Sequence, residues 1–171
     1  MSPMKTSPRQ PASNLGEEKA PPGGALLLVL ELHSDPKLLS VVRGTVERLA
    51  EILGFPAAQG RSITRAVDEA LSNILKHCYG NRPGLPISIH FLSSERSQEG
   101  QVQQGLEILL SDRGPKIDPA KLHGRALDEI RPGGLGLHLI HQAMDIVEFT
   151  RKGPTNQLRL VKYLAQKKNI L

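Results

Sequence analysis

Glu69, Asn73 and His77 recur every fourth residue, so on a helix they would form a single row. The apolar residues around them have helical spacing too and predict a core-facing stripe, made of Ile63, Ala66, Val67, Ala70, Leu71, Ile74, Leu75 and Cys78. The row follows one margin of this stripe, which places a carboxylate, an amide and an imidazole where the helix leaves the core and meets a cleft. Taken alone, the segment is more typical of a polar border on a packed helix.

Two other segments place polar or glycine residues at the ends of expected elements. Asp112-Arg113-Gly114 follows a predicted strand, where an aspartate can accept a hydrogen bond from an exocyclic amine; a strand-terminating turn is the alternative. Residues 133–137, Gly-Gly-Leu-Gly-Leu, open a predicted helix, and glycines there let backbone N–H groups approach a phosphate. A flexible hinge is the alternative for this segment, which is neither a Walker loop nor a dinucleotide-binding fingerprint.

The remaining sequence predicts the elements that position these residues. We expect a strand at 25–33, helices at 36–53 and 59–79, strands at 87–91 and 106–110, a helix from 133 to about 144, and strands at 146–150 and 158–164. Residues 93–104 are polar and predict a loop, residues 115–132 predict an irregular segment with a short helix near 120–130, and residues 152–156 predict a turn. Short connections favour antiparallel strands, and three amphipathic helices can cover one face. The pattern predicts a two-layer α/β (α+β) sandwich.

Length and composition limit the domain organisation and the class of partner. Residues 1–24 are rich in Pro, Ser and Gly and predict a disordered tail, residues 25–165 one domain, and residues 166–171 a short C-terminal tail. Aromatic residues make up 3% of the 171 residues and Trp is absent, which argues against stacking platforms for nucleic acid. The apolar run at 25–30 is too short to span a membrane. The single cysteine excludes an internal disulfide and fits the cytoplasm.

In this order and spacing, the three segments resemble the N, G1 and G2 boxes of the GHKL ATPase superfamily, and most closely those of bacterial anti-sigma-factor serine/threonine kinases. The helix pattern Glu-Ala-x-x-Asn-x-x-x-His-x-Tyr is present at 69–79, and the G1 pattern Asp-x-Gly at 112–114. The G2 pattern, Gly-Leu-Gly-Leu followed by a helix and Met-Asp, is present at 134–137 and 144–145. The resemblance implies a Bergerat ATP-binding fold over about 25–164, with a mixed, mostly antiparallel sheet covered on one face by three helices.

The resemblance also implies roles for individual residues. Glu69 would be the general base toward a substrate serine, Asn73 would hold Mg²⁺ between the ATP phosphates, and Asp112 would bind the adenine amino group. The segment 120–132 would be the lid over ATP. The further ATP-binding positions implied in this way are Lys76, His77, Gly114, Ile117, Gly133, Gly134, Leu135, Gly136 and Leu137. For Lys76, a solvated surface charge is the alternative.

By the same resemblance, the chain would be a cytoplasmic anti-sigma factor with serine kinase activity that uses ATP and Mg²⁺. It would bind a sigma factor and phosphorylate a STAS-type anti-sigma-factor antagonist, without direct contact to nucleic acid or membrane, and a homodimer is possible by analogy. Two positions depart from the family pattern: Lys116 replaces a second G1 glycine, and residues 155–157, Thr-Asn-Gln, replace a Gly-Thr-Thr strand entry whose threonine supports the adenine aspartate. The altered G1 box favours the alternative, a catalytically weak or silent nucleotide-binding protein that acts only by sequestering a partner.

Overall fold

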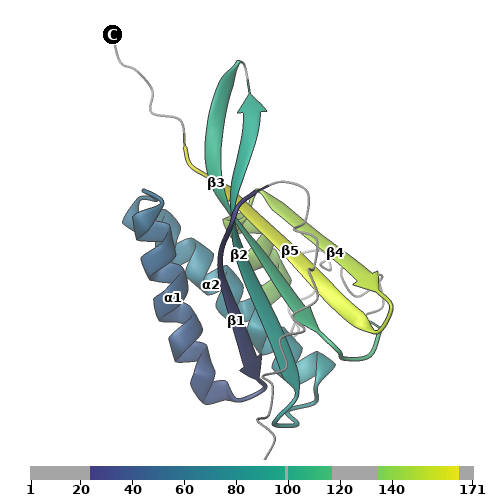
Figure 1. The fold of residues 1–171 in the computed structure, drawn as a ribbon. Coiled ribbons are helices and arrows are strands. Elements are labelled where there is room, and N and C mark those ends of the chain that lie inside the picture. The colour runs from purple at the N-terminus through teal and green to yellow at the C-terminus, as the bar shows by residue number, and fades with distance from the viewer. Residues whose placement is uncertain (1–23, 99, 117–134, 166–171) are drawn as a thin grey trace, which may run out of the picture.

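Five strands and three α-helices form two layers in the part of the chain that the computed structural model describes, residues 24–98, 100–116 and 135–165. The strand order is β1-β2-β3-β5-β4, and all four pairings between these strands are antiparallel. The helices lie on one face of the sheet (Figure 1), so the predicted two-layer architecture is confirmed. The elements are β1 (Leu26–His33), the 3₁₀ turn η1 (Pro36–Leu38), α1 (Leu39–Ile52), α2 (Ala57–Asn73), the π-helical turn η2 (Ile74–Cys78), β2 (Pro86–Gln98), β3 (Gln101–Asp112), α3 (Leu135–Ala143), β4 (Ile146–Lys152) and β5 (Thr155–Tyr163).

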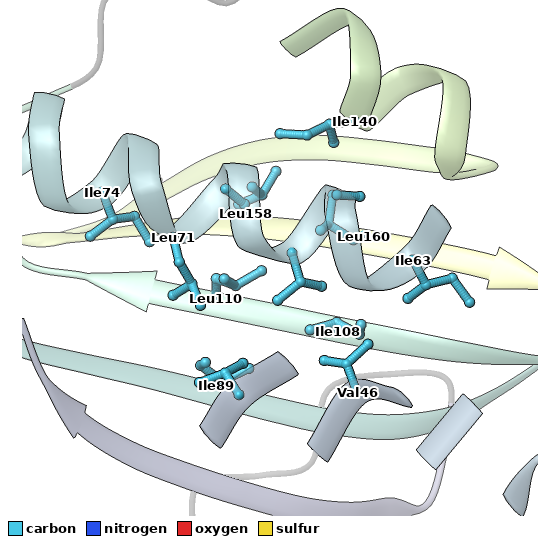
Figure 2. Packing of buried hydrophobic residues seen from close by; sticks show 14 of the residues in the cluster. Val46, Ile63, Leu71, Ile74, Ile89, Ile108, Leu110, Ile140, Leu158 and Leu160 are labelled. Carbon is cyan, nitrogen blue, oxygen red and sulfur yellow. The ribbon is translucent and has the colours of Figure 1, made fainter. Parts of the chain in front are cut away.

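The core lies between the sheet and the apolar face of α2. Ile63, Leu71 and Ile74 point from α2 and its π-helical end toward the sheet, where Ile108 and Leu160 meet them (Figure 2). Each of these side chains is at most 6% exposed, and burying one of this size stabilises the fold by about 1.5–3 kcal/mol. The helix that carries Glu69 and Asn73 is therefore fixed on the sheet by its own apolar stripe, as the sequence predicted.

The polar segment at 93–104 is not a loop, so that prediction was wrong. Strands β2 and β3 continue through it as a hairpin, with pairs from Ser94 and Gly105 out to Gln98 and Gln101. Gly100, with φ of 76°, lies in the turn and has a backbone conformation that glycine adopts at little cost. A polar segment can form these strands because they satisfy each other's backbone hydrogen bonds. Most side chains of the hairpin are exposed, and the two buried ones, Ser94 and Gln103, are polar.

The turn predicted at 152–156 is also shorter than expected, because β4 extends to Lys152 and β5 begins at Thr155. The predicted tails, apart from residue 24, and the predicted lid at 120–132 lie outside the described residues. Within the described part of the chain, no helix is long and apolar enough to cross a membrane.

Candidate functional site

Glu69 and Asn73 lie half-buried near the end of α2, at the margin of its apolar face. Lys76 and His77 are exposed, because the helix widens into the π-helical turn η2 directly after Asn73. In this turn the Tyr79 amide donates to a carbonyl five residues back, and the fourfold spacing of the row no longer keeps its members on one face. The structure therefore brings two of the three row residues to the margin of the core and leaves His77 at the surface.

The same π-helical turn directs Cys78 and Tyr79 inward, where they are 8% and 2% exposed. The Tyr79 hydroxyl donates to the Pro86 carbonyl at 2.5 Å and accepts from the Arg113 amide at 2.9 Å. One tyrosine thus connects the end of the α2 segment to the start of β2 and to the residue that follows β3. Its place in the helix pattern was recognised from the sequence, but this bridging contact was not.

Asp112 ends β3 and is 4% exposed. Its Oδ1 accepts hydrogen bonds from the Gly114 amide at 2.7 Å and from Nδ2 of Asn156 at 2.9 Å. Burial, and after it the charge of Asp112 and hydrogen bonding to it, together raise the pKa of the adjacent Cys78 thiol to about 12. The thiol is therefore neutral at physiological pH and lies beside the Asp112 carboxylate.

Gly114 is required by the packing of this turn. A Cβ at this position would lie 2.6 Å from Cβ of Cys78 and 2.8 Å from Oδ1 of Asp112, so a larger residue would displace one of them. Pro115 and Lys116 are both exposed. The lysine that replaces the second G1 glycine therefore lies outside the buried part of the turn.

Asn156 and Arg151 complete the turn, and sequence reasoning missed both. The antiparallel register places Asn156 opposite Asp112 on one side and opposite Arg151 on the other. Besides Asp112, Nδ2 of Asn156 donates to the Pro115 carbonyl at 3.0 Å, while Oδ1 accepts from Nη1 of Arg151 at 2.5 Å. The sequence did identify residues 155–157 as the place where the family's supporting threonine is replaced, but the register was needed to identify the asparagine as the replacement.

Glu69 lies against the first turn of α3. A Cβ added at Gly136 would overlap Oε1, Cδ and Cγ of the Glu69 side chain, so the carboxylate occupies the space that a glycine leaves open. Leu135 begins α3, and the side chain of Leu137 packs against the core. The predicted site residues Ile117, Gly133 and Gly134 lie outside the described residues.

The described residues fit a magnesium nucleotide with an adenine base. They contain no cluster of three or more His, Cys, Asp or Glu side chains that could hold a metal ion by itself. A magnesium ion bound with a nucleotide needs only one or two protein ligands, because phosphates and water complete its coordination; Asn73 can supply one amide oxygen. Since the Gly114 amide and the Asn156 amide both use Oδ1 of Asp112, its Oδ2 remains able to accept from the adenine amino group.

Comparison with known proteins identifies the family of the chain. The model of the histidine kinase-like ATPase domain matches residues 32–162. Serine-protein kinase RsbW of Oceanobacillus iheyensis is 26% identical over 145 residues, which cover 80% of this chain and 86% of that protein. Serine/threonine-protein kinase BtrW of Bordetella bronchiseptica is 31% identical over 108 residues, which cover 61% of this chain and 70% of that protein.

Among solved structures, the SiaB-SiaC complex of Pseudomonas aeruginosa matches with a TM-score of 0.58 and 13% identity, over 81% of this chain and 90% of the matched chain. At this identity the likeness concerns the fold alone. The sequence matches go further, because the family model covers residues 32–162, a range that includes the three motifs. The chain therefore belongs to the histidine kinase-like ATPase domain family and, within it, to the anti-sigma-factor serine/threonine protein kinases that its motifs resemble.

Proposed function

We propose that the protein is an anti-sigma factor with ATP-dependent serine kinase activity, which binds a sigma factor and phosphorylates a STAS-type anti-sigma-factor antagonist. The contact between the Glu69 carboxylate and Gly136 carries this proposal. This contact places the proposed general base, Glu69, at the start of α3, where free backbone N–H groups favour an anion such as a phosphate. Asp112 supports the adenine end of the same nucleotide, since it is a buried carboxylate with donors fixed on one oxygen.

In the proposed reaction, ATP supplies the transferable phosphoryl group, and a bound Mg²⁺ would neutralise the charge on its phosphates. Asn73 would hold the metal, and Glu69 orients the substrate serine. The serine oxygen forms a bond to the γ-phosphorus, the bond from that phosphorus to the bridging oxygen of ADP breaks, and the serine proton passes to the Glu69 carboxylate. General-base assistance of this kind typically contributes on the order of 10²–10⁴-fold, and the rest of the acceleration comes from positioning and charge neutralisation.

Glu69→Gln tests the proposed base, because it keeps the side-chain shape and removes the basic oxygen. We expect phosphoryl transfer to a purified STAS antagonist to fall at least about a hundredfold, while ATP affinity and partner binding change less than about threefold. Glu47→Gln is the matched control, since it makes the same chemical change at an exposed position of α1. Transfer by Glu69→Gln at the rate of Glu47→Gln would rule out the base assignment.

The alternative is a protein that binds a nucleotide or none and acts only by sequestering a partner. The Pro115-Lys116 departure in the G1 box favours it. The two proposals differ in one measurement: a wild-type protein that binds its antagonist but transfers no labelled phosphate to it would favour sequestration. In either case we place the protein in the cytoplasm, where its single thiol, Cys78, would stay reduced, and a homodimer remains a prediction that light scattering can test.

A further inference from the structure

The side-chain amide of Asn156 has an orientation that its surroundings determine. Its Nδ2 faces three acceptors, Oδ1 of Asp112 at 2.9 Å and the carbonyls of Pro115 at 3.0 Å and Gly114 at 3.4 Å. Its Oδ1 faces a donor that cannot accept, Nη1 of Arg151. A flipped amide would oppose like groups on both sides, so only one orientation satisfies the site.

This orientation also determines how Asp112 is presented. Because Nδ2 of Asn156 and the Gly114 amide both donate to Oδ1, the carboxylate cannot rotate without losing two hydrogen bonds in a buried site. Oδ2 is then the oxygen that can accept from a ligand. Arg151, on β4, donates both to Oδ1 of Asn156 and to the Gly114 carbonyl, the latter at 3.3 Å. It therefore fixes the Asn156 amide relative to the turn that follows Asp112.

We propose that Asn156, fixed by Arg151, is a positioning residue that sets base selectivity by directing Oδ2 of Asp112 toward the 6-amino group of adenine. The inference rests on the proposed nucleotide function and adds a residue to it. The side-chain amide of asparagine has two N–H donors, whereas a threonine hydroxyl has one, so Asn156 can donate to two acceptors at once. It therefore supports the aspartate and the exposed Pro115-Lys116 segment at once, where the family pattern has a threonine and a second glycine.

The test compares the affinities for MgATP and MgITP, which differ in having an amino or a carbonyl group at position 6 of the purine. Wild type should prefer ATP at least about tenfold, or about 1.4 kcal/mol. Asn156→Asp keeps the shape but turns the donor into an acceptor that faces Asp112, so ATP affinity at pH 8 should fall at least about thirtyfold and the preference should disappear. Gln157→Glu is the matched control: it makes the same change at the next position of β5, on the opposite face of the sheet, and should keep the wild-type preference.

A pH series separates positioning from a merely structural role. Two facing carboxylates share a proton as pH falls, which restores a donor between residues 156 and 112. ATP affinity of Asn156→Asp should therefore recover at least about fivefold between pH 8 and pH 6, relative to Gln157→Glu. The titratable groups beside Asp112 at the end of η2 are Cys78 and Tyr79, whose raised pKa values keep them neutral in this range. The charged groups nearby are Arg151, which contacts Asn156, and the exposed Arg113, which is next to Asp112 in the chain.

Arg151→Met provides a second variant at an exposed position, should Asn156→Asp fail to fold. It removes the donor that fixes the amide and should lower the preference for ATP over ITP about three- to fivefold. Lys152→Met, which removes the same charge one residue later on β4, should leave the preference unchanged. If wild type binds neither nucleotide, the proposed function fails and the inference with it. If wild type prefers ATP and neither Asn156→Asp nor Arg151→Met reduces that preference, the inference alone is overturned.

Discussion

Gly136→Ala should lower the phosphoryl-transfer activity of this protein while leaving its folding stability nearly unchanged. Gly136 lies in the first turn of α3, and replacing a helical glycine by alanine ordinarily stabilises a protein by about 0.5–1 kcal/mol. At this position, however, the new Cβ would occupy the space now filled by the carboxylate end of Glu69. The backbone of α3 can stay in place, because a flexible side chain is what must move.

The magnitude follows from what Glu69 is proposed to do. If its carboxylate is displaced, phosphoryl transfer loses the general base and should fall at least about a hundredfold, which corresponds to about 2.7 kcal/mol of transition-state stabilisation. Folding should suffer little, since the gain in helix propensity offsets the cost of moving one side chain. The expected result is a protein that has lost most of its phosphoryl transfer but keeps a nearly unchanged melting temperature.

The assay is single-turnover transfer from labelled ATP to the antagonist at saturating ATP, together with a thermal melt. Gly44→Ala is the matched control, because Gly44 lies in the exposed face of α1 and a Cβ there meets nothing within 4 Å. It should raise stability by up to about 1 kcal/mol and leave transfer unchanged. Transfer by Gly136→Ala within about threefold of Gly44→Ala would show that Glu69 does not act from the position described.

Two further predictions concern the metal and the buried thiol. Asn73→Ala should weaken ATP binding at least about tenfold in Mg²⁺ and leave binding in EDTA nearly unchanged, whereas an equal loss in both would remove Asn73 as the ligand. Cys78, whose pKa is raised from 9.0 to about 12, should react with iodoacetamide at pH 8 at least about a hundredfold more slowly than the urea-unfolded chain, and similar rates would contradict its burial beside Asp112. Because the folded pKa is the higher one, the contribution of Cys78 to stability should be complete below pH 9.0 and decline as pH rises toward 12.

The sequence predicted the fold class and the positions of the helices because hydrophobic spacing reports which face of an element is buried. The same signal failed for the hairpin at 93–104, where neither face is apolar and only the pairing of β2 with β3 makes the segment regular. Hydrophobic spacing also gave no sign of the π-helical turn at 74–78, because the apolar residues of this segment fit an ordinary α-helix equally well. That turn moves His77 to the surface and turns Cys78 toward Asp112.

The sequence by itself determined which residue types are available for chemistry: a carboxylate and an amide one helical turn apart at 69 and 73, an aspartate at a strand end, and glycines at a helix start. Tertiary structure alone decided their neighbours. The antiparallel register of β3, β5 and β4 places Asn156 between Asp112 and Arg151, and the packing of α3 on α2 brings Gly136 to Glu69. These partners are 44 and 67 residues apart in the chain, and contacts at such separations depend on strand register and helix packing, which local spacing does not specify.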